Sequence, residues 1–552
     1  MGKKIVLGVL AAAVLLGGLA YLMRVDIVLY LAATTGKVEV SPHQEINWKT
    51  ADPDRASKAA DGAPNIIFIL ADDLGINDIS TYGGGMNGGA FKTPHIDRLA
   101  TEGANFTQAY AGTGTCAPSR AMLMTGRYPS RTGFEFTPTP NGMAGIVAMV
   151  SESMDSGLPD AHIPDRSDVP ELDYEDKGLP GSELTVAEVL QEAGYHTVHI
   201  GKWHLGRGEE FDATSQGFDE SLLMASGMFL PEDDPNVVNA KLDFDPIDKF
   251  LWARMQYAAS YNGSEWFEPG GYLTDYWTQE AQKVIRANKD NPFFLYLAHW
   301  GIHTPLQATK EDYEAVGDIQ PHRARVYAAM MRAVDRSVGD IIQTLEEEGI
   351  ADNTIIVFSS DNGGAGYIGI PDVNAPYRGW KITLFEGGIR VPMLMRWPDR
   401  IPAGTEIESP VAHIDVMPTL AAAGEGMIPE TIEIDGKDLL PLATGTSTED
   451  PHEAIFWTSG YYRVVRAGDW KLQVSERPNK AWLFNLATDP TEQTNLAEAN
   501  PDVVSRLTAL LDAHSAGSRP PLYPHQAEFP VAVDKTRAER FEDGDEVIYW
   551  PN

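Results

Sequence analysis

The sequence predicts an α/β protein with a large, mostly parallel sheet flanked by helices, and a smaller C-terminal α+β subdomain with an antiparallel sheet. Two observations predict this class. Short continuous apolar runs, typical of strands covered on both faces, alternate with amphipathic helical stretches over most of the chain. Towards the C-terminus, short strand-like runs follow one another without helices between them, which indicates antiparallel pairing.

The N-terminal region has the features of an export segment. Lys3 and Lys4 precede an apolar run over residues 5–23, which is typical of a signal peptide or a signal anchor. The run reaches the length that begins to span a bilayer, and no clear small-x-small cleavage site follows it, so an uncleaved membrane anchor is an alternative to a cleaved signal. We therefore predict a signal or anchor over residues 1–35, a linker over residues 36–63, and an exported protein that is periplasmic or otherwise extracytoplasmic.

Composition and charge restrict the functional classes. The chain has 552 residues, 43% of them hydrophobic, which is typical of a globular protein. Its formal net charge of −36 argues against a nucleic-acid partner and against attraction to anionic membrane surfaces. Cys116 is the only cysteine, so no intramolecular disulfide can form, which favours a reactive role for its thiol.

Four apolar runs in the predicted catalytic domain, residues 64–440, each end in polar residues. The runs cover residues 65–71, 196–200, 292–298 and 354–360. Because the carboxyl ends of parallel strands meet at one edge of a sheet, the side chains that follow them are expected to converge on one crevice. Predicted helices cover residues 184–193, 274–288, 322–348 and 416–423.

Two irregular stretches, residues 137–181 and 208–266, interrupt this alternation. The first is too long for an ordinary connection and is predicted to face the substrate. A C-terminal subdomain and tail are predicted over residues 441–552. The predicted apolar wall of the first stretch consists of Ile146, Val147, Met149 and Val150. The subdomain's predicted strands cover residues 454–457, 461–467, 471–474 and 481–485, and its predicted helix covers residues 502–514.

Two pairs of oxygen-donating side chains follow two of the apolar runs. Asp72 and Asp73 come after the first run, and Asp361 and Asn362 come after the last. Oxygen ligands select Ca²⁺ or Mg²⁺ over Zn²⁺, which prefers histidine and cysteine. One such pair alone would indicate a helix cap or a turn, but two pairs at the ends of buried strands predict a metal site.

Cationic and imidazole side chains complete the predicted crevice. Arg120, Lys202 and Lys381 are candidate cations for a tetrahedral oxyanion, although a single lysine or arginine is usually a solvated surface charge. His204 and His303 follow separate strands and are candidates for the catalytic acid and base, because imidazole titrates near neutral pH.

Residues 112–126, GTGTCAPSRAMLMTG, put the only cysteine at the start of a predicted helix. Pro118 suits the first helical turn, and Gly126 ends the helix. Cys116 then lies next to the free backbone N–H groups of a helix N-terminus, the usual position of a bound anion or an activated thiol.

This segment resembles the C-x-P-S-R…T-G-R signature of the type I sulfatases, arylsulfatase-like enzymes of the alkaline phosphatase-like superfamily. The matching residues are Cys116-Ala117-Pro118-Ser119-Arg120, followed by Thr125-Gly126-Arg127. Further motifs of that family match GKWHLG at residues 201–206, HTP at residues 303–305 and GWKITLFEGGIRVP at residues 379–392. One difference is His95, which stands where many members have asparagine.

The resemblance implies a modified nucleophile and a metal. Cys116 would be oxidised to formylglycine by a separate maturation enzyme, and the hydrated aldehyde would attack the sulfate ester. A divalent cation, usually calcium with magnesium as the alternative, would accompany it. The metal ligands would be Asp72, Asp73, Asp361, Asn362 and the formylglycine at Cys116.

The resemblance also implies roles for the basic side chains. His204 would assist the formylglycine, and His303 would protonate the departing alcohol. His299 would support these residues without contacting the substrate. Three cations would hold the nucleophile and the sulfate oxygens: Arg120, Lys202 and Lys381.

The predicted reaction is hydrolysis of a small-molecule sulfate monoester of an aryl or alkyl alcohol. One alternative is a phosphonate monoester or phosphodiester hydrolase of the same superfamily, because phosphate and sulfate esters share their geometry. The other is a non-catalytic protein that binds sulfated ligands. Turnover of an aryl sulfate against that of matching phosphorus esters tests the first alternative, and the mass of the peptide that contains Cys116 tests the second.

Overall fold

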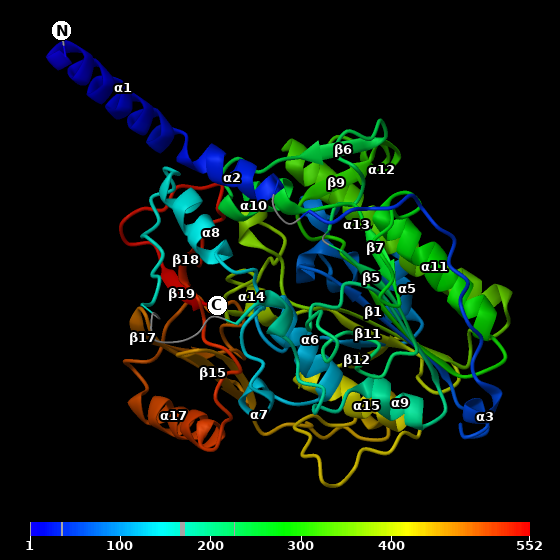
Figure 1. Ribbon diagram of the computed structural model, residues 1–552. Helices are drawn as coiled ribbons and strands as arrows, with labels where there is room; N and C mark the ends of the chain where they lie inside the picture. Colours follow the sequence, from blue (N-terminus) through cyan, green and yellow to red (C-terminus); the bar gives the residue numbers. More distant parts are fainter. Residues whose placement is uncertain (1, 35–36, 166–171, 226) are drawn as a thin grey trace.

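The computed structural model describes residues 2–34, 37–165, 172–225 and 227–552, so residues 166–171 of the predicted insertion and both ends of the predicted signal segment lie outside the described residues. Its centre is a nine-stranded sheet with helices on both faces (Figure 1). In spatial order the strands are β12 (Thr405–Ile407), β2 (Ala104–Phe106), β11 (Met393–Arg396), β10 (Thr354–Ser360), β1 (Asn65–Ala71), β8 (Phe293–Ala298), β4 (His196–Gly201), β5 (Glu220–Met224) and β7 (Ala259–Tyr261).

The four central strands, β10, β1, β8 and β4, all run parallel. Antiparallel pairs among the described strands of this sheet occur towards its edges, between β10 and β11, β11 and β2, and β5 and β7. The mostly parallel sheet is therefore confirmed. Its parallel centre puts the carboxyl ends of four strands side by side, where the predicted polar residues follow.

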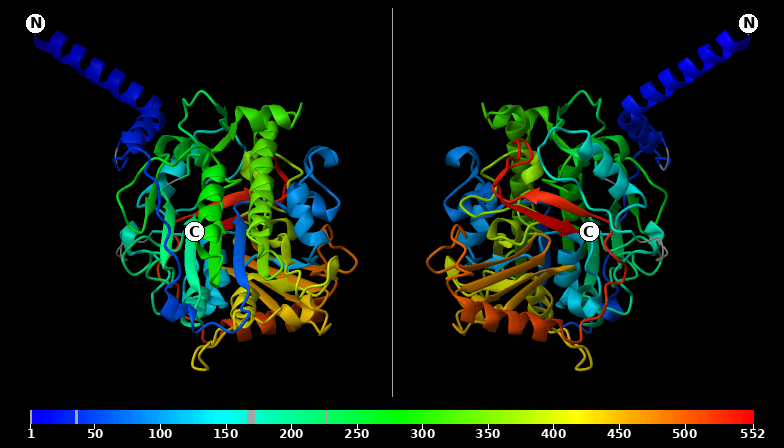
Figure 2. Two further views of the ribbon diagram at one scale, coloured as in Figure 1. Left: turned by 90° about the vertical axis from the view of Figure 1, so that its right-hand side faces the viewer. Right: turned by 90° about the vertical axis from the view of Figure 1, so that its left-hand side faces the viewer.

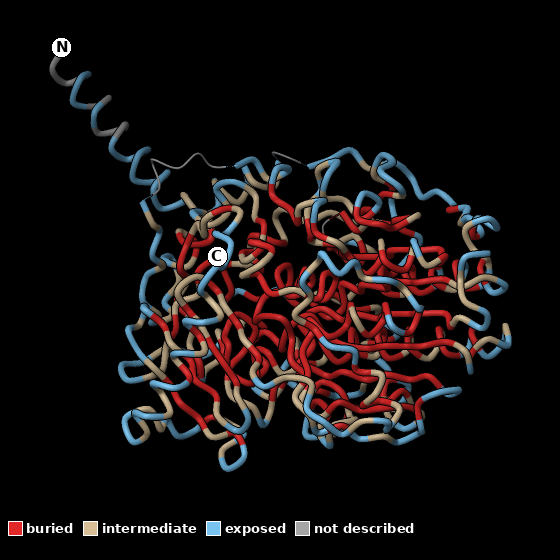
Figure 3. Tube along the Cα trace, turned by 90° about the horizontal axis from the view of Figure 1, so that it is seen from below, coloured by how far each residue is buried: buried red, intermediate tan, exposed pale blue. Residues whose placement is uncertain are grey.

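β1 is apolar throughout because its side chains alternate between two buried faces. Ile67 and Ile69 pack in a cluster with α11 and α13 on one face, and Ile66, Phe68 and Leu70 pack with α6, α9 and α15 on the other. Figure 3 shows buried residues concentrated along this sheet. The helices are α6 (Cys116–Thr125), α9 (Val186–Glu192), α11 (Leu273–Asn288), α13 (His322–Glu347) and α15 (Val416–Ala423).

The C-terminal region contains a four-stranded antiparallel sheet, as predicted. A helix packs on one face of it, while Trp457, Trp482 and Phe484 form a cluster with Tyr110 and Phe385 of the larger part. The sheet consists of β14 (Ile455–Ser459), β15 (Tyr462–Ala467), β16 (Trp470–Glu476) and β17 (Asn479–Asn485), and the helix is α17 (Pro501–Ser515).

Several elements form where the sequence predicts none. Residues 208–266, expected to be irregular, hold β5, β7 and α10 (Pro246–Arg254), and the insertion holds α8 (Met143–Glu152). Near the C-terminus, β18 (Glu528–Ala532) and β19 (Val547–Pro551) form a hairpin. Both hairpin strands contain proline and several partly buried residues, so neither shows the continuous apolar run of a central strand.

The N-terminal apolar segment forms two helices, α1 (Gly2–Leu22) and α2 (Arg24–Thr34). α1 extends away from the body, whereas α2 lies against α10 (Figures 1 and 2). Of the described helices, none alone is long and apolar enough to cross a membrane. Val14–Leu22 and Arg24–Thr34 together meet that test of length and composition, as a pair bent by 67°.

Candidate active site

Polar side chains that follow the central strands meet at one edge of the sheet. Asp72 and Asp73 follow β1, Asp361 and Asn362 follow β10, and all four are buried. The backbone N–H of Asp73 donates to Asp361 Oδ1 at 3.2 Å, and Asn362 Nδ2 donates to Asp73 Oδ1 at 2.9 Å. The parallel register of β1 and β10 therefore joins two residue pairs that are distant in the sequence.

Arg120 holds two of these carboxylates. It has no exposed surface, and its Nη2 lies 2.8 Å from Asp361 Oδ2 and 3.2 Å from Asp72 Oδ2. Its Nη1 donates to the backbone carbonyl of Lys202 at 2.9 Å. Because these acceptors occupy the guanidinium, Arg120 does not line the cavity that the lysines line. Its Nη2 lies between the carboxylates of Asp72 and Asp361, and its expected contact with sulfate oxygens stays a prediction.

Lys202 and Lys381 bring positive charge to the same carboxylates. Lys202 Nζ lies 2.6 Å from Asp72 Oδ2, and Lys381 Nζ lies 2.6 Å from Asp73 Oδ1. Burial, followed by the negative charge of Asp361, raises the pKa of Asp72. Burial also acts to raise the pKa of Asp73, but the charges of Lys381, His303 and Lys202 together outweigh it and lower that pKa, so Asp73 is ionised at neutral pH.

Cys116, the first residue of α6, lies within this cluster. Its Sγ is 3.7 Å from Asp72 Oδ1 and 3.8 Å from Asp73 Oδ1, and the residue is 4% exposed. A helix N-terminus favours a thiolate, but burial and the charge of Asp361 outweigh this effect and raise the pKa of the thiol. The unmodified thiol is therefore neutral at pH 7.

The cluster suits a divalent cation. Ligand atoms of Asp72, Asp73, Cys116 and His303 lie within 4.8 Å of one another. Asn362 Oδ1 is buried and has no hydrogen-bond partner among the described residues. A buried carbonyl oxygen is rarely left unpaired, and coordination to Ca²⁺ or Mg²⁺ would satisfy it. The oxygen-rich set of donors therefore fits a hard cation better than zinc.

The three histidines differ in position. His204 and His303 line the cavity, whereas His299 is fully buried and bonds a serine hydroxyl of α13 at 2.9 Å. His303 Nδ1 donates to the backbone carbonyl of Thr304 at 2.6 Å, and its Nε2 lies 3.6 Å from Asp73 Oδ2. Burial lowers the pKa of His303 to about 3, so the ring is neutral at pH 7 and releases a proton readily once it is charged.

Cys116, Lys202, His204, His303 and Lys381 all line one cavity of about 600 Å³. A volume of this order is typical of pockets that enclose a drug-sized ligand. The cavity therefore has room for a sulfate group and for a sizeable alcohol attached to it.

Two aromatic residues of the site were missed by the sequence analysis. Tyr367 donates its hydroxyl proton to Asp73 Oδ2 at 2.7 Å and accepts from Lys381 Nζ at 3.3 Å. Trp300 stacks on His303 with ring centroids 4.0 Å apart. Each of them lies shortly after a central strand, and that position beside the polar residues is the signal that could have found them.

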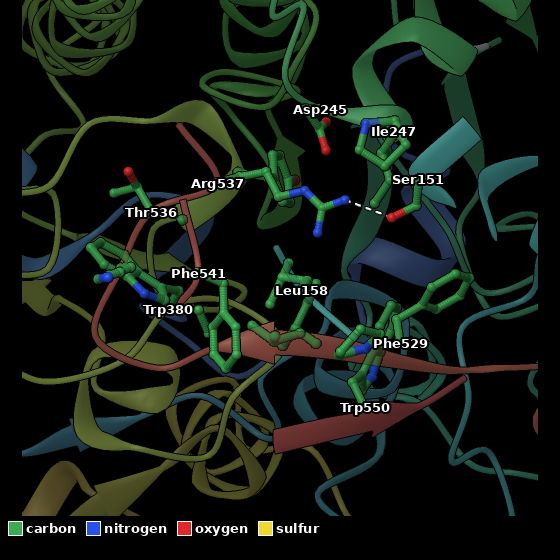
Figure 4. A pocket seen from close by; sticks show the side chains of 18 of the residues that line it. Ser151, Leu158, Asp245, Ile247, Trp380, Phe529, Thr536, Arg537, Phe541 and Trp550 are labelled. Carbon is green, nitrogen blue, oxygen red and sulfur yellow. Dashed lines mark hydrogen bonds between the residues drawn. The ribbon is translucent and has the colours of Figure 1, made fainter. Parts of the chain in front are cut away.

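The predicted insertion faces the cavity only in part. Residues 137–140 and 174–175 line it, but none of the four predicted wall residues does. Val147 instead lines a second cavity of about 90 Å³, bordered also by residues of α10 and the C-terminal hairpin. Figure 4 shows Arg537 reaching into this second cavity, where its Nη2 donates to Ser151 Oγ at 2.7 Å.

The loops of Cys116 and Lys381 touch through a glycine. The backbone N–H of Ile382 donates to Gly114 O at 2.6 Å, and a Cβ on Gly114 would lie 2.5 Å from Thr383 O. Ile382 has a φ of 83°, and His204 has a φ of 62°. Residues other than glycine rarely adopt this left-handed backbone conformation. The surrounding structure therefore holds the backbone at Ile382 and His204, so these parts of the site are ordered before a ligand binds.

Comparison with known proteins identifies the family. A family model described as Sulfatase matches residues 64–427, and one described as N-sulphoglucosamine sulphohydrolase, C-terminal, matches residues 379–516. Steryl-sulfatase of Homo sapiens is 31% identical over 510 residues, which cover 79% of this chain and 78% of that protein. N-acetylgalactosamine-6-sulfatase of Homo sapiens is 30% identical over 490 residues, which cover 82% of this chain and 85% of that protein.

A solved structure gives the same result. The crystal structure of Ps i-CgsB in complex with k-i-k-neocarrahexaose matches with a TM-score of 0.67 and 31% sequence identity, over 84% of this chain and 94% of that chain. The family model and these relatives extend over most of the chain, including the cysteine segment and the central strands. The chain therefore belongs to the sulfatases, a family of sulfuric ester hydrolases.

Proposed function

We propose that this sulfatase hydrolyses the sulfate monoester of an aryl or alkyl alcohol, with a formylglycine made from Cys116 as nucleophile. The observation that carries the proposal is the meeting of Cys116 with Asp72, Asp73 and His303, whose ligand atoms lie within 4.8 Å of one another. Two lysines beside this cluster supply positive charge on the wall of the same cavity.

The proposed metal is Ca²⁺, with Mg²⁺ as the alternative. Asp72, Asp73, Asp361 and Asn362 would hold it, because they offer buried oxygens and one of these oxygens has no other partner among the described residues. When bound, the cation would supply positive charge that polarises the sulfate oxygens.

The modification of Cys116 is proposed because the encoded thiol suits the reaction poorly. Burial raises the pKa of this thiol, and attack by sulfur would leave a thiosulfate without an easy exit. A hydrated formylglycine would supply a hydroxyl nucleophile and a second hydroxyl that lets sulfate leave. A separate maturation enzyme is therefore a required partner of this chain.

The chain's own residues would divide the remaining work. Lys202 and Lys381 would bind the sulfate oxygens and stabilise the charge that develops on them. His303 Nε2 would first take up a proton from solvent and then pass it to the departing alkoxide or phenoxide, because the Nδ1 proton is already committed to a backbone carbonyl. His204, on the same cavity wall, would assist the nucleophile, and Arg120 would keep the carboxylates in place.

The test compares esters of one phenol. The full chain is produced with and without a formylglycine-generating enzyme, and the peptide that contains Cys116 is weighed by mass spectrometry. We expect the matured protein to hydrolyse 4-nitrophenyl sulfate, and Cys116→Ala to be inactive while its circular dichroism stays unchanged. A preference for the matching phosphodiester or phosphonate ester would overturn the proposal, as would activity retained in Cys116→Ala.

Export and anchoring are part of the same proposal. The apolar pair α1 and α2 would direct the chain out of the cytoplasm and hold it at the membrane, which agrees with their exposed apolar side chains. Fractionation of expressing cells tests this point. Recovery of the full-length chain with the extracytoplasmic face of the membrane is expected, whereas a cytoplasmic protein would contradict it.

A further inference from the structure

Part of the lining of the main cavity is apolar and suits an apolar group. Its lining includes the aromatic side chains of Phe250, Trp266 and Trp550, together with Leu251 and Met255. The cavity volume of about 600 Å³ is much larger than the volume of a sulfate group. An apolar lining of this extent favours a large hydrophobic alcohol, because burial of apolar surface drives its binding.

Few charges face this part of the cavity. Outside the catalytic cluster, its charged lining residues among the described ones are Glu175, Arg207 and Arg254. The guanidinium of Arg207 is 5.8 Å from the rings of Tyr174 and Trp266, and it bonds the carbonyl of Ala225. The charged side chains therefore do not form the continuous basic surface that a polyanionic polymer would need.

α10 separates this apolar lining from the N-terminal helices. Ile247, Phe250, Leu251 and Arg254 recur at helical spacing and line the cavity, and α2 packs against the same helix (Figure 1). The site and the N-terminal segment are therefore neighbours in space.

α2 is apolar on the side that faces away from the protein as well. Val25, Val28 and Leu29 are partly buried, whereas Ile27 and Tyr30 are 41% and 68% exposed. The exposed apolar surface continues along α1, where large side chains are open to solvent. Exposure of this apolar surface to water is unfavourable, and insertion into a lipid bilayer would bury it.

A described residue four positions beyond the end of α2 contributes to the cavity wall. Val38 lines the cavity, and its backbone N–H and carbonyl are both bonded by the side-chain amide of Gln256, at 2.8 and 2.9 Å. This two-bond contact fixes the position of the cavity wall relative to the segment that leaves α2. Membrane association of α1 and α2 would therefore bring the cavity close to the lipid surface.

We infer that the substrate is the sulfate ester of a large apolar alcohol, and that the enzyme takes it up from a lipid surface beside α2. The inference rests on the proposed function, because it specifies the alcohol of the sulfate ester. The sulfate group keeps such an ester at the water interface, while its apolar part dissolves in lipid. Uptake from lipid would then deliver the ester with its apolar part already next to the apolar lining.

The test uses matured full-length enzyme with zwitterionic phosphatidylcholine vesicles and two substrates, pyrenyl sulfate and 4-nitrophenyl sulfate. With vesicles, we expect kcat/KM for pyrenyl sulfate to exceed that for 4-nitrophenyl sulfate by roughly tenfold or more. The double variant Ile27→Glu/Tyr30→Glu should float with vesicles less than the wild type and should lose most of this advantage, because α2 would no longer lie on the lipid. Its activity on 4-nitrophenyl sulfate should stay at the wild-type level.

The matched control is Met427→Glu. Met427 is 86% exposed and lies on neither cavity wall, so this variant introduces a glutamate in place of an exposed apolar side chain elsewhere and should float and react as the wild type does. Trp550→Ala provides a second readout, because it should lower kcat/KM for pyrenyl sulfate by more than for 4-nitrophenyl sulfate.

The outcomes separate the inference from the function beneath it. Hydrolysis of 4-nitrophenyl sulfate without any preference for pyrenyl sulfate overturns the inference and leaves the proposed function standing. A preference that is identical with and without vesicles, or in the double variant, overturns uptake from lipid and with it the inference as stated. Failure to hydrolyse either sulfate after maturation overturns the proposed function itself.

Discussion

The unpaired oxygen of Asn362 leads to a prediction about metal binding. An ion that binds only the folded state stabilises it by about 2.7 kcal/mol at a concentration of 100 times its Kd. We therefore expect CaCl₂ added to chelator-treated protein to raise the thermal midpoint, measured by differential scanning fluorimetry. Asn362→Leu should remove most of this rise, because it deletes the buried oxygen that has no other partner among the described residues.

The control for this experiment is Asn141→Leu, since Asn141 is exposed and lies outside the carboxylate cluster. It should respond to calcium as the wild type does. A larger rise with MgCl₂ would identify magnesium as the preferred ion. An equal rise in Asn362→Leu and the wild type would contradict the assignment of Asn362.

Glu135 leads to a prediction about pH. Burial raises its pKa from 4.5 to about 7, although a hydrogen bond from the backbone N–H of Gly460 opposes the shift. The folded state therefore keeps a proton that the unfolded chain has already lost, so stability falls as the pH rises from about 4.5 to about 7. The effect is at most roughly 3 kcal/mol, from ~1.4 kcal/mol per pKa unit.

Urea unfolding of Glu135→Gln measures this effect. At pH 5 the variant and the wild type should have similar midpoints, because both side chains are neutral in the fold. At pH 8 the variant should unfold at a higher urea concentration than the wild type. A midpoint difference that does not change between the two pH values would show that Glu135 is not the titrating group.

Among single residues, the sequence predicted the charged side chains and the candidate metal ligands. It did not predict the aromatic side chains that contact them. Asp72 and Asp361 stand out because carboxylates at the ends of apolar runs are unusual. Tyr367 and Trp300 were missed because an aromatic residue near a strand end is most simply explained as core. The setting of Arg120 was also not predictable, since its partners come from two strands distant in the sequence.

Among the elements, α14 (Glu386–Ile389) and β16 are joined by a buried group of three charges. Lys471 Nζ lies 2.9 Å from Glu386 Oε1 and 2.9 Å from Glu492 Oε1, and all three side chains are fully buried. The backbone N–H of Glu386 also donates to Glu492 Oε2 at 2.6 Å. Glu386 lies shortly after Lys381, so this group connects the C-terminal sheet to a loop of the site.

Replacement of Lys471 tests the importance of that connection. Lys471→Met leaves buried Glu492 without its cation and buried Glu386 with Arg390 alone, which should cost about 3–5 kcal/mol in the free energy of unfolding. Lys480→Met is the control, because the pair of Lys480 with Glu546 is partly exposed and should contribute less than about 1 kcal/mol. Urea denaturation measures both, and similar losses in the two variants would contradict the prediction.

The elements that the sequence predicted best are those with uniform surroundings. β1, β10 and α15 have the predicted bounds, because their apolar runs are continuous and end abruptly. β5 and the hairpin of β18 and β19 were missed, since their residues are covered by distant parts of the chain. A half-buried strand that contains proline has the composition of a loop, so it cannot be identified as a strand from the sequence unless its partner strand is known.

For the whole molecule, one buried cluster joins the C-terminal sheet to the larger part of the protein. It contains Trp457 and Trp482 of the C-terminal sheet and Tyr110, Met122 and Phe385 of the larger part. Because neither part can expose this surface without cost, we expect a single thermal transition, with the same midpoint by tryptophan fluorescence and by far-ultraviolet circular dichroism. Two resolved midpoints would mean that the C-terminal sheet unfolds independently.

The order of the strands in the sheet is the part of the architecture that the sequence could not supply. β1 pairs with β10 and β8, both of which lie more than 200 residues further along the chain. Apolar composition makes each of these strands suitable for the centre of the sheet, but it does not select which neighbours they take. The site residues lie together because these particular strands are neighbours in the sheet.

The distance along the chain between the partners of the site also has a consequence in time. Arg120 and Asp361 are 241 residues apart. At synthesis rates of about 5–20 residues per second, roughly 10–50 s pass between the appearance of the two. During that interval β10 does not yet exist, so Asp361, whose charge acts on Cys116 in the folded protein, is missing. An enzyme that modifies Cys116 could use this period, and the order of synthesis would then set the time available for maturation.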